Sequence, residues 1–254
     1  MATDDALRDA LENGELVLSG RLLDASNAAY LGHVDGIACV YKPRSGEREL
    51  WDFPSGTLAH REVAAFKLAE RIGLDIVPTT VWRDDGPAGP GMCQRWIEHS
   101  ESAPPVDVVP VGTSPNDWRV VMTGAAPDGS EVELSHADTS ALRDIALFDA
   151  IVNNADRKAG HLLVDLAGKL WCIDHGISFH PDPKLRTVLW GFAGSPFDAR
   201  HVSMLDALTE VEFLSAHLDE VELLSLQDRI AHLRRTGSFP FPSNDWPPLP
   251  WPLF

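Results

Sequence analysis

Two short stretches of the sequence concentrate residue types that can do chemistry. Residues 149–161 read DAIVNNADRKAGH, and residues 172–176 read CIDHG. The apolar run between them turns at Ala167-Gly168, which predicts a β-hairpin. Because a hairpin brings its two ends together, we expect Asp156 and Asp174 to lie at the same end of a cleft. Carboxylates grouped with imidazoles favour proton transfer or the binding of a divalent metal.

A lysine and a glutamate earlier in the chain complete a set suited to phosphoryl transfer. Lys42 ends a strand-like run, VYKP, and Glu62 lies early in the helical stretch that follows. In phosphoryl transfer a strand lysine neutralises phosphate charge and a helical glutamate holds that lysine. One aspartate then orients the attacking hydroxyl and another holds the metal. Each residue alone is weak evidence, and their order along the chain carries the prediction.

The first half of the chain is expected to form a small sheet with one inserted helix. Residues 4–13 predict a short helix, and residues 15–43 read as three antiparallel strands separated by turn residues. A helix over 57–73 follows, with a capping threonine before it and a glycine at its end. Two further strands are expected within 76–98.

The second half is expected to be mostly helical. Residues 99–117 read as a loop, and residues 138–154 have the apolar spacing of a helix. The hairpin over 161–174 comes next, followed by helices at about 202–218 and 218–235. A sheet lobe beside a helical lobe leaves a cleft between them, which is a common place for a binding site.

The stretches NNADRKAGHLL and CIDHG resemble the catalytic and metal-binding loops of the phosphatidylinositol 3-/4-kinase superfamily, whose bacterial relatives include the HipA-type kinases. The resemblance covers about Leu16 to Pro196 and is closest to an actinobacterial group. It implies a two-lobed, protein-kinase-like α+β fold in a single domain. The N-lobe would be a small antiparallel sheet with one inserted helix, and the C-lobe would be mostly helical with a catalytic hairpin. The expected ranges are about 15–98 for the N-lobe, 99–137 for a linker and 138–254 for the C-lobe.

The resemblance also implies roles around an ATP site. Asp156 would be the catalytic aspartate, Lys42 would contact the ATP phosphates, and Glu62 would pair with that lysine. Asp174 would bind a divalent metal, Mg²⁺ or Mn²⁺. The loop over the phosphates would contain Ser26 and Asn27, and the hinge against which adenine packs would contain Gln94, Arg95, Trp96, Ile97 and Glu98.

Two positions depart from the pattern of that family. His161 stands where the family usually has an asparagine as second metal ligand, and His175 replaces the usual aromatic residue. If His161 is a ligand, Mn²⁺ is favoured, because Mg²⁺ prefers oxygen donors. The alternative is that His161 hydrogen-bonds the loop backbone and is not a ligand, which would leave the protein catalytically weak. The substitution at this position therefore keeps a second hypothesis open, a pseudokinase that binds nucleotide with little turnover. A third hypothesis is a metallohydrolase that uses His161, Asp174, His175 and His180.

The net charge of the protein limits which kinds of molecule are expected to accept the phosphate. The formal net charge of −17 disfavours nucleic acid and anionic membranes as partners, since its field repels phosphates. No apolar run approaches the ~20 residues of a membrane helix, and the acidic N-terminus is unlike a signal peptide, so a cytoplasmic protein is expected. The acceptor would then be a soluble inositol-like or other small hydroxyl compound, or a protein. Basic side chains expected to hold an anionic group of it are Arg157, Lys158, Lys184 and Arg186.

Two further expectations concern segments outside the proposed site. Cys39, Cys93 and Cys172 each lie in an apolar run and are expected to be buried thiols. The tail over 238–254 is rich in proline and tryptophan. Its aromatic residues are expected to pack back on the domain, although such a tail can also serve as a polyproline ligand.

Overall fold

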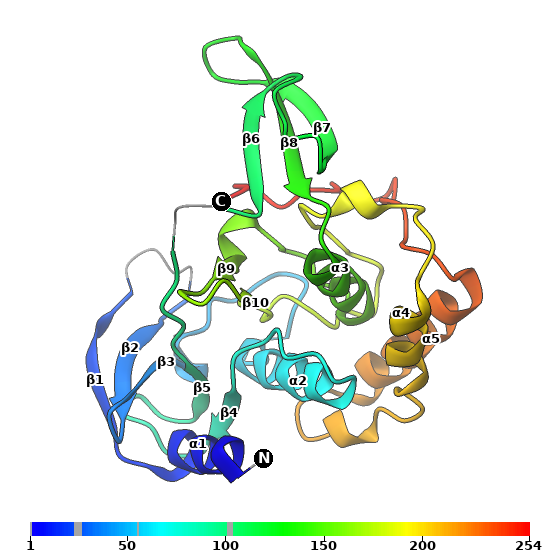
Figure 1. Ribbon diagram of the computed structural model, residues 1–254. Coiled ribbons are helices and arrows are strands. Elements are labelled where there is room, and N and C mark those ends of the chain that lie inside the picture. Colours follow the sequence, from blue (N-terminus) through cyan, green and yellow to red (C-terminus); the bar gives the residue numbers. More distant parts are fainter. Residues whose placement is uncertain (1, 23–26, 55, 101–103) are drawn as a thin grey trace.

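A computed structural model describes residues 2–22, 27–54, 56–100 and 104–254, so Ser26 lies outside the described residues. The protein is a mixed α+β structure with antiparallel sheets (Figure 1). A five-stranded sheet forms one side, helices form the centre and the other side, and a small three-stranded sheet stands out from the body. No helix in these ranges combines the length and the apolar character needed to cross a membrane.

The five-stranded sheet has the strand order β1-β2-β3-β5-β4, with antiparallel neighbours throughout. The turn between β2 and β3 is made by Asp35 and Gly36, both with positive φ, as a tight hairpin requires. Helix α1 covers one face through the buried Leu11. The elements are α1 (Ala2–Asn13), β1 (Leu16–Arg21), β2 (Tyr30–Val34), β3 (Ile37–Pro43), β4 (Thr80–Arg83) and β5 (Gly91–Arg95).

Strand β3 fixes the direction of Lys42. Side chains alternate across a strand, so Ala38 and Lys42 share one face while Cys39 and Tyr41 share the other. Cys39 and Tyr41 are fully buried in the core between the sheet and α1. Lys42 therefore points away from that core, toward the helical half of the molecule.

Helix α2 (Leu58–Arg71) lies between the sheet and the helical half (Figure 1). Its start is held by Glu47, whose carboxylate accepts hydrogen bonds from the backbone N–H groups of Leu58 and Ala59 at 3.0 and 2.8 Å. This is charge-assisted capping of a helix N-terminus, supplied from outside the helix. Its end is followed by Gly73, with positive φ. The helix is buried along most of its length, including Glu62.

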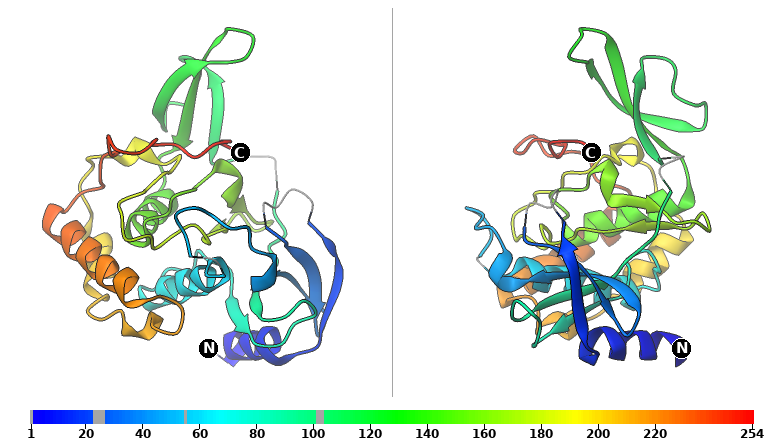
Figure 2. Two further views of the ribbon diagram at one scale, coloured as in Figure 1. Left: turned by 180° about the vertical axis from the view of Figure 1, so that it is seen from behind. Right: turned by 90° about the vertical axis from the view of Figure 1, so that its left-hand side faces the viewer.

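The segment expected to be a linker forms a sheet of its own. Its strand order is β6-β8-β7, and it stands away from the body in both views of Figure 2. The prediction that 99–117 is a loop was therefore wrong for the strand within it. Prolines at both ends of that short strand hid it, and its partner lies far along the chain: Val106 pairs with His136. The strands are β6 (Val106–Pro110), β7 (Trp118–Ala125) and β8 (Glu131–Ala137).

The remaining residues are organised around α3 (Ser140–Val152), whose apolar side chains lie in the main core. The hairpin β9 (Leu162–Val164) and β10 (Leu170–Cys172) follows as predicted. Helix α4 (Ala199–Asp206) is shorter than expected, and α5 spans Glu220–Thr236. Between them Leu208, Val211 and Leu214 are buried in irregular chain with one 3₁₀ turn. A three-residue apolar spacing fits both a helix and such turns, which explains the overlong prediction.

The C-terminal tail lies against the domain, but the prediction that its aromatic residues pack there holds only in part, because Phe239 is buried while Phe241, Trp251 and Phe254 are exposed. Its Pro248 carbonyl accepts hydrogen bonds from Thr187 N at 3.2 Å and from Trp190 Nε1 at 2.7 Å. The Leu253 carbonyl accepts from Ala159 N at 2.8 Å. The tail thus reaches the loop that contains Asp156. The three cysteines are free and buried, as expected.

Candidate active site

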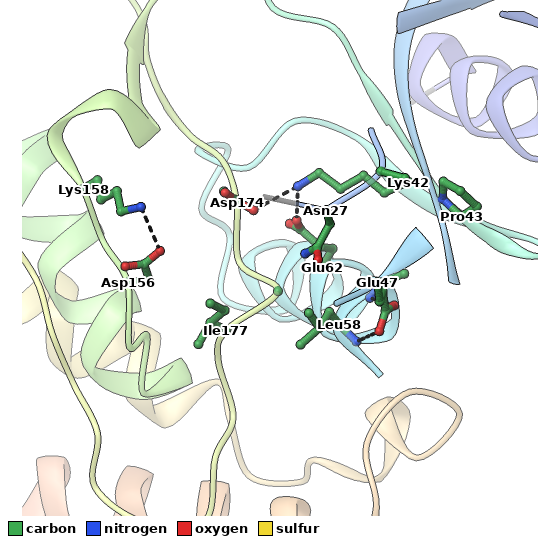
Figure 3. A pocket seen from close by; sticks show the side chains of 13 residues that line it. Asn27, Lys42, Pro43, Glu47, Leu58, Glu62, Asp156, Lys158, Asp174 and Ile177 are labelled. Atoms are coloured by element: carbon green, nitrogen blue, oxygen red, sulfur yellow. Dashed lines mark hydrogen bonds and ion pairs between the residues drawn. The ribbon is translucent and has the colours of Figure 1, made fainter. Parts of the chain in front are cut away.

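One pocket gathers side chains from distant parts of the chain (Figure 3). Lys42 comes from β3, Glu62 from α2, Asp156 from the loop after α3, and Asp174 from the loop after β10. Asn27, Lys158 and other residues complete the lining. The four residues that the sequence singled out for phosphoryl transfer therefore lie together.

Lys42 lies between two carboxylates. Its Nζ is 2.7 Å from Glu62 Oε1 and 2.9 Å from Asp174 Oδ1 (Figure 3). Burial disfavours the charged ammonium, but the carboxylates of Asp174 and Glu62 together raise the pKa of Lys42 above its ordinary value. Lys42 therefore stays protonated at physiological pH, and its ammonium contacts both carboxylates.

Asp174 is the most accessible carboxylate of this cluster. Its side chain is 47% exposed, whereas that of Glu62 is 2% exposed. The Lys42 ammonium lowers the pKa of Asp174 well below the usual range, against the effect of burial. Its backbone has φ of 62°, a conformation that non-glycine residues seldom adopt and that concentrates at functional sites. The conformation, the charge and the exposure are those expected of a carboxylate that binds a cation.

His161 lies beside Asp174. Its Nε2 is 3.4 Å from Asp174 Oδ2, and its Nδ1 accepts a long hydrogen bond of 3.5 Å from Lys158 N. Burial lowers the pKa of His161 to about 4, so the ring is neutral at pH 7. With Nδ1 accepting, the proton is on Nε2 and faces the carboxylate. Metal ligation by Nε2 requires the other tautomer.

Asp156 occupies the other end of the pocket. Its side chain is 24% exposed, and its Oδ2 is 3.3 Å from Lys158 Nζ. The loop is held in shape by Asn154, whose side-chain oxygen accepts from Asp156 N at 3.0 Å. Burial raises the pKa of Asp156, and Lys158 opposes that shift only in part. A partly exposed carboxylate with a raised pKa is a suitable proton acceptor.

A buried ion pair supports this loop from below. Arg157 and Asp149 are both fully buried, and the guanidinium makes contacts of 2.9 to 3.2 Å with both carboxylate oxygens. Arg157 also donates to the Ile173 carbonyl at 2.8 Å and to His175 Nε2 at 2.7 Å. His175 N in turn donates to Glu62 Oε2 at 2.9 Å. A continuous polar network thus joins α3 to the ion pairs of Lys42.

Two basic residues that were expected to bind substrate are buried and fully engaged. The predicted substrate contact does not hold for Arg157, whose guanidinium is 0% exposed and serves the network just described. Lys184 is 2% exposed, lies 2.5 Å from Asp52, and has the rings of Trp51 and Trp246 within 5 Å. Both predictions are wrong for the same reason. Each cation is buried in an ion pair with a carboxylate and is therefore not accessible to a ligand. Lys158 and Arg186 remain partly exposed.

The predicted hinge lies beside a second pocket, of 360 Å³, at the start of β3. Gln94 is buried in β5, and its side chain donates to Thr80 Oγ1 at 2.8 Å. The next four predicted hinge residues line this pocket together with Ala38 and the hairpin turn 165–167. They are Arg95, Trp96, Ile97 and Glu98.

Of the four residues of the metallohydrolase hypothesis, His161 and Asp174 lie close together, but His175 and His180 do not join them as ligands. His175 is buried against Arg157, and His180 packs on Phe53 and lies 3.8 Å from Asp182. Within the described ranges no three histidine, cysteine or acidic side chains form a cluster of their own that could hold a metal. A metal at Asp174 would need further ligands from outside the protein.

Comparison with known proteins places the chain in a family. The sequence is 39% identical over 273 residues to protein Rv2133c of Mycobacterium tuberculosis, and the match covers 100% of this chain and 98% of that protein. The chain belongs to the Rv2133c family. No model of a larger protein family matches this member. Among solved structures, the Helicobacter pylori proinflammatory kinase CtkA matches over 90% of this chain and 94% of its own, with a TM-score of 0.47 and 9% identity.

Sequence reasoning missed Asp149. The signal was present, because Asp149 follows Phe148 on the apolar helix α3, where a charge requires a partner. The most probable partner from spacing alone is a residue one turn away on the same helix. The actual partner, Arg157, lies beyond the helix end, after a left-handed turn at Asn153.

Proposed function

We propose that this protein is an ATP-dependent phosphotransferase with a protein-kinase-like fold, resembling the phosphatidylinositol 3-/4-kinases. It would transfer the γ-phosphate to a hydroxyl of a soluble acceptor. The observation that carries the proposal is the convergence of Lys42, Glu62, Asp156 and Asp174 on one pocket. Phosphoryl transfer asks little covalent chemistry of a protein and depends on positioning and charge, which these residues supply.

In the proposed mechanism Lys42 offsets the charge of the ATP phosphates. Glu62, held by its hydrogen bond from His175 N, fixes the ammonium in place. Asp156 accepts the proton of the acceptor hydroxyl, since its raised pKa and partial exposure suit a base. The adenine would lie in the hinge pocket, which shares the face of β3 with Lys42.

The donors near Asp174 fit a divalent metal. Asp174 offers a half-exposed carboxylate, and His161 offers a neutral ring within 3.4 Å of it. Mg²⁺ in such sites typically takes one or two protein ligands and completes its shell with phosphate oxygens and water. When bound, Mg²⁺ or Mn²⁺ would supply neutralisation of phosphate charge. His161 acts as a ligand only after giving up its contact with Lys158 N, and otherwise it orients Asp174.

Lys158 and Arg186 are proposed to hold an anionic group of the acceptor. Lys158 Nζ lies beside Asp156, and the Arg186 guanidinium is near enough to lower the pKa of that aspartate. The backbone of Arg186 is fixed to this loop by hydrogen bonds to Asn154 O and from Arg157 N. Its Nε is buried and has no hydrogen-bond partner among the described residues. A phosphate or carboxylate would supply the missing acceptor.

The test is ADP formation with a panel of inositols, other small polyols and proteins as acceptors. Asp156→Ala should abolish turnover while ATP still binds. Arg186→Gln should raise the acceptor KM about tenfold or more with little change in kcat, as expected for losing a charge-assisted hydrogen bond. Unchanged turnover in Asp156→Ala would refute the assignment. Metal-dependent ATP binding without turnover on any acceptor would favour the pseudokinase alternative.

A further inference from the structure

A cavity of 490 Å³ lies between α5 and the segment that contains Pro181 and Pro183. It is separate from the pocket of Lys42 and shares no lining residue with it. Figure 1 shows α5 on the far side of α3 from the five-stranded sheet. The basic side chains in the lining are Arg229, His232 and Arg235, at successive three-residue steps of α5, which places them on neighbouring turns.

Arg229 is a partly buried cation that forms no ion pair with a carboxylate among the described residues. Its Nε donates to Ile151 O at 3.0 Å and its Nη1 to His180 O at 3.3 Å, both neutral carbonyls. Its Nη2 is buried with no hydrogen-bond partner among the described residues. Burial lowers the pKa of Arg229 to about 10, with no acidic neighbour to oppose the shift. The guanidinium is thus partly desolvated, and no carboxylate pairs with it in the described ranges.

The arginines that are buried in the described part of this acidic protein are paired. Arg61 contacts Glu222, Arg83 contacts Asp85, and Arg157 contacts Asp149. An unpaired arginine in a chain of net charge −17 therefore needs an explanation that the fold does not supply. The hydrogen bonds to two carbonyls explain the positions of Nε and Nη1 of Arg229, but Nη2 has no partner among the described residues.

The neighbours of Arg229 extend the positive surface into the cavity. Arg235 is exposed, and its Nη2 lies 3.1 Å from His232 Nδ1. Arg235 stands in the last turn of α5, where the helix dipole also favours a cation, so its presence has an explanation apart from any ligand, whereas that of Arg229 has none. Asp228 also lines the cavity, and it forms no ion pair with either arginine in the described part of the chain. Two guanidinium groups against one carboxylate leave the wall positive.

We propose that this cavity binds the phosphate group of a small phosphorylated compound, held by Arg229 and Arg235. Guanidinium groups suit phosphate because they present several donors to its oxygens at once. The volume lies within the range of about 300–1,000 Å³ typical of small-molecule sites, so there is room for an organic part as well as the phosphate. The site stands independently of the proposed transfer reaction.

Binding at this place would stiffen the segment after Asp174. Arg229 holds the His180 carbonyl, and Asn153 donates to the carbonyls of His180 and Asp182 at 2.8 and 2.6 Å. An anion that fixes Arg229 therefore fixes the same segment. Ligand binding to the folded state raises the melting temperature by mass action, which provides a readout that needs no activity.

The experiment titrates the full-length protein with inorganic phosphate and with glycerol phosphate, by calorimetry and thermal shift at constant ionic strength. Arg235→Gln, at an exposed position, should weaken phosphate binding about tenfold or more. Arg234→Gln is the matched control, since it removes the same charge from the same turn but from a side chain that lies 3.6 Å from Asp206, outside the cavity. The affinity of the Arg234→Gln variant for phosphate should stay within about twofold of that of the wild type.

Two comparisons separate the sources of a signal. If glycerol phosphate binds more tightly than inorganic phosphate, the rest of the cavity contacts the organic part of the ligand. If the two bind equally, the phosphate group alone provides the affinity. Lys42→Met should leave the signal intact. Binding lost in Lys42→Met but kept in Arg235→Gln would overturn the proposal, because it would locate the phosphate in the cleft. So would the absence of any phosphate-specific signal up to about 10 mM, beyond the usual range of metabolite affinities.

Discussion

Replacing Asp149 by alanine removes the partner of a fully buried cation. Arg157 and Asp149 are both 0% exposed, and Arg157 has no other carboxylate among its hydrogen-bond partners. The variant therefore leaves an uncompensated charge in the core between α3 and the loop that contains Asp156. Breaking such a pair costs about 3–5 kcal/mol.

That cost converts into a large shift of the melting temperature. A domain of this size loses about 2–4 °C per kcal/mol, so Asp149→Ala should melt roughly 6–20 °C below the wild type. The control is Glu70→Ala, which breaks the solvent-exposed pair of Glu70 with Arg8. Exposed pairs contribute at most about 1 kcal/mol, so that variant should stay within about 4 °C.

Calorimetry and urea unfolding of the two variants provide the measurement. The double variant Asp149→Leu/Arg157→Met should recover part of the loss, because it removes the unpaired charge together with its site. A melting temperature of Asp149→Ala within about 2 °C of the wild type would refute the view that this pair supports the loop. A double variant no more stable than the single one would show that the cost comes from lost packing rather than from charge.

Three further perturbations test other parts of the account. The free energy of unfolding should fall as pH drops from about 6.5 to 4, because burial lowers the pKa values of His161 and His217 to about 4 in the folded state while the unfolded chain binds protons near 6.5. Urea unfolding at several pH values measures this dependence. The variant His217→Gln should reduce the slope of unfolding free energy against pH, and a slope equal to that of the wild type would contradict the assignment. Asp174→Asn should remove the dependence of ATP affinity on Mg²⁺ or Mn²⁺, so a metal effect equal to that of the wild type in calorimetric titrations would exclude Asp174 as the ligand. Trp246→Ala should destabilise the protein by about 1–2 kcal/mol, because it uncovers the buried Lys184 ammonium; a stability equal to that of the wild type would mean that the tail adds nothing there.

Local patterns were sufficient to predict the elements that hold the candidate site. The strand that ends at Lys42, the helix that contains Glu62 and the hairpin before Asp174 all form as expected, because each has its own apolar period and turn residues. The order of these elements then brings Lys42, Glu62 and Asp174 within hydrogen-bond distance of one another.

Features that depend on distant pairing escaped prediction. The strand at Val106 becomes visible only through its partner at His136, and the ion pair of Arg157 only through a partner on α3. The same limit explains the failure for Lys184, because its partner Asp52 lies 132 positions earlier in the chain. A basic residue next to a catalytic motif looks like a ligand-binding residue until its burial is known.

The most direct test of the central claim is ATP consumption by the purified protein with Mg²⁺ and with Mn²⁺, measured beside Asp156→Ala. We predict turnover that requires a divalent metal and disappears in the variant, while thermal shift shows that the variant still binds ATP. Asp156 lies in the pocket with Lys42 and Asp174 but forms no hydrogen bond with either, so its loss should leave their ion pairs intact. Equal turnover in the variant, or no binding of ATP by the wild type with either metal, would contradict the account.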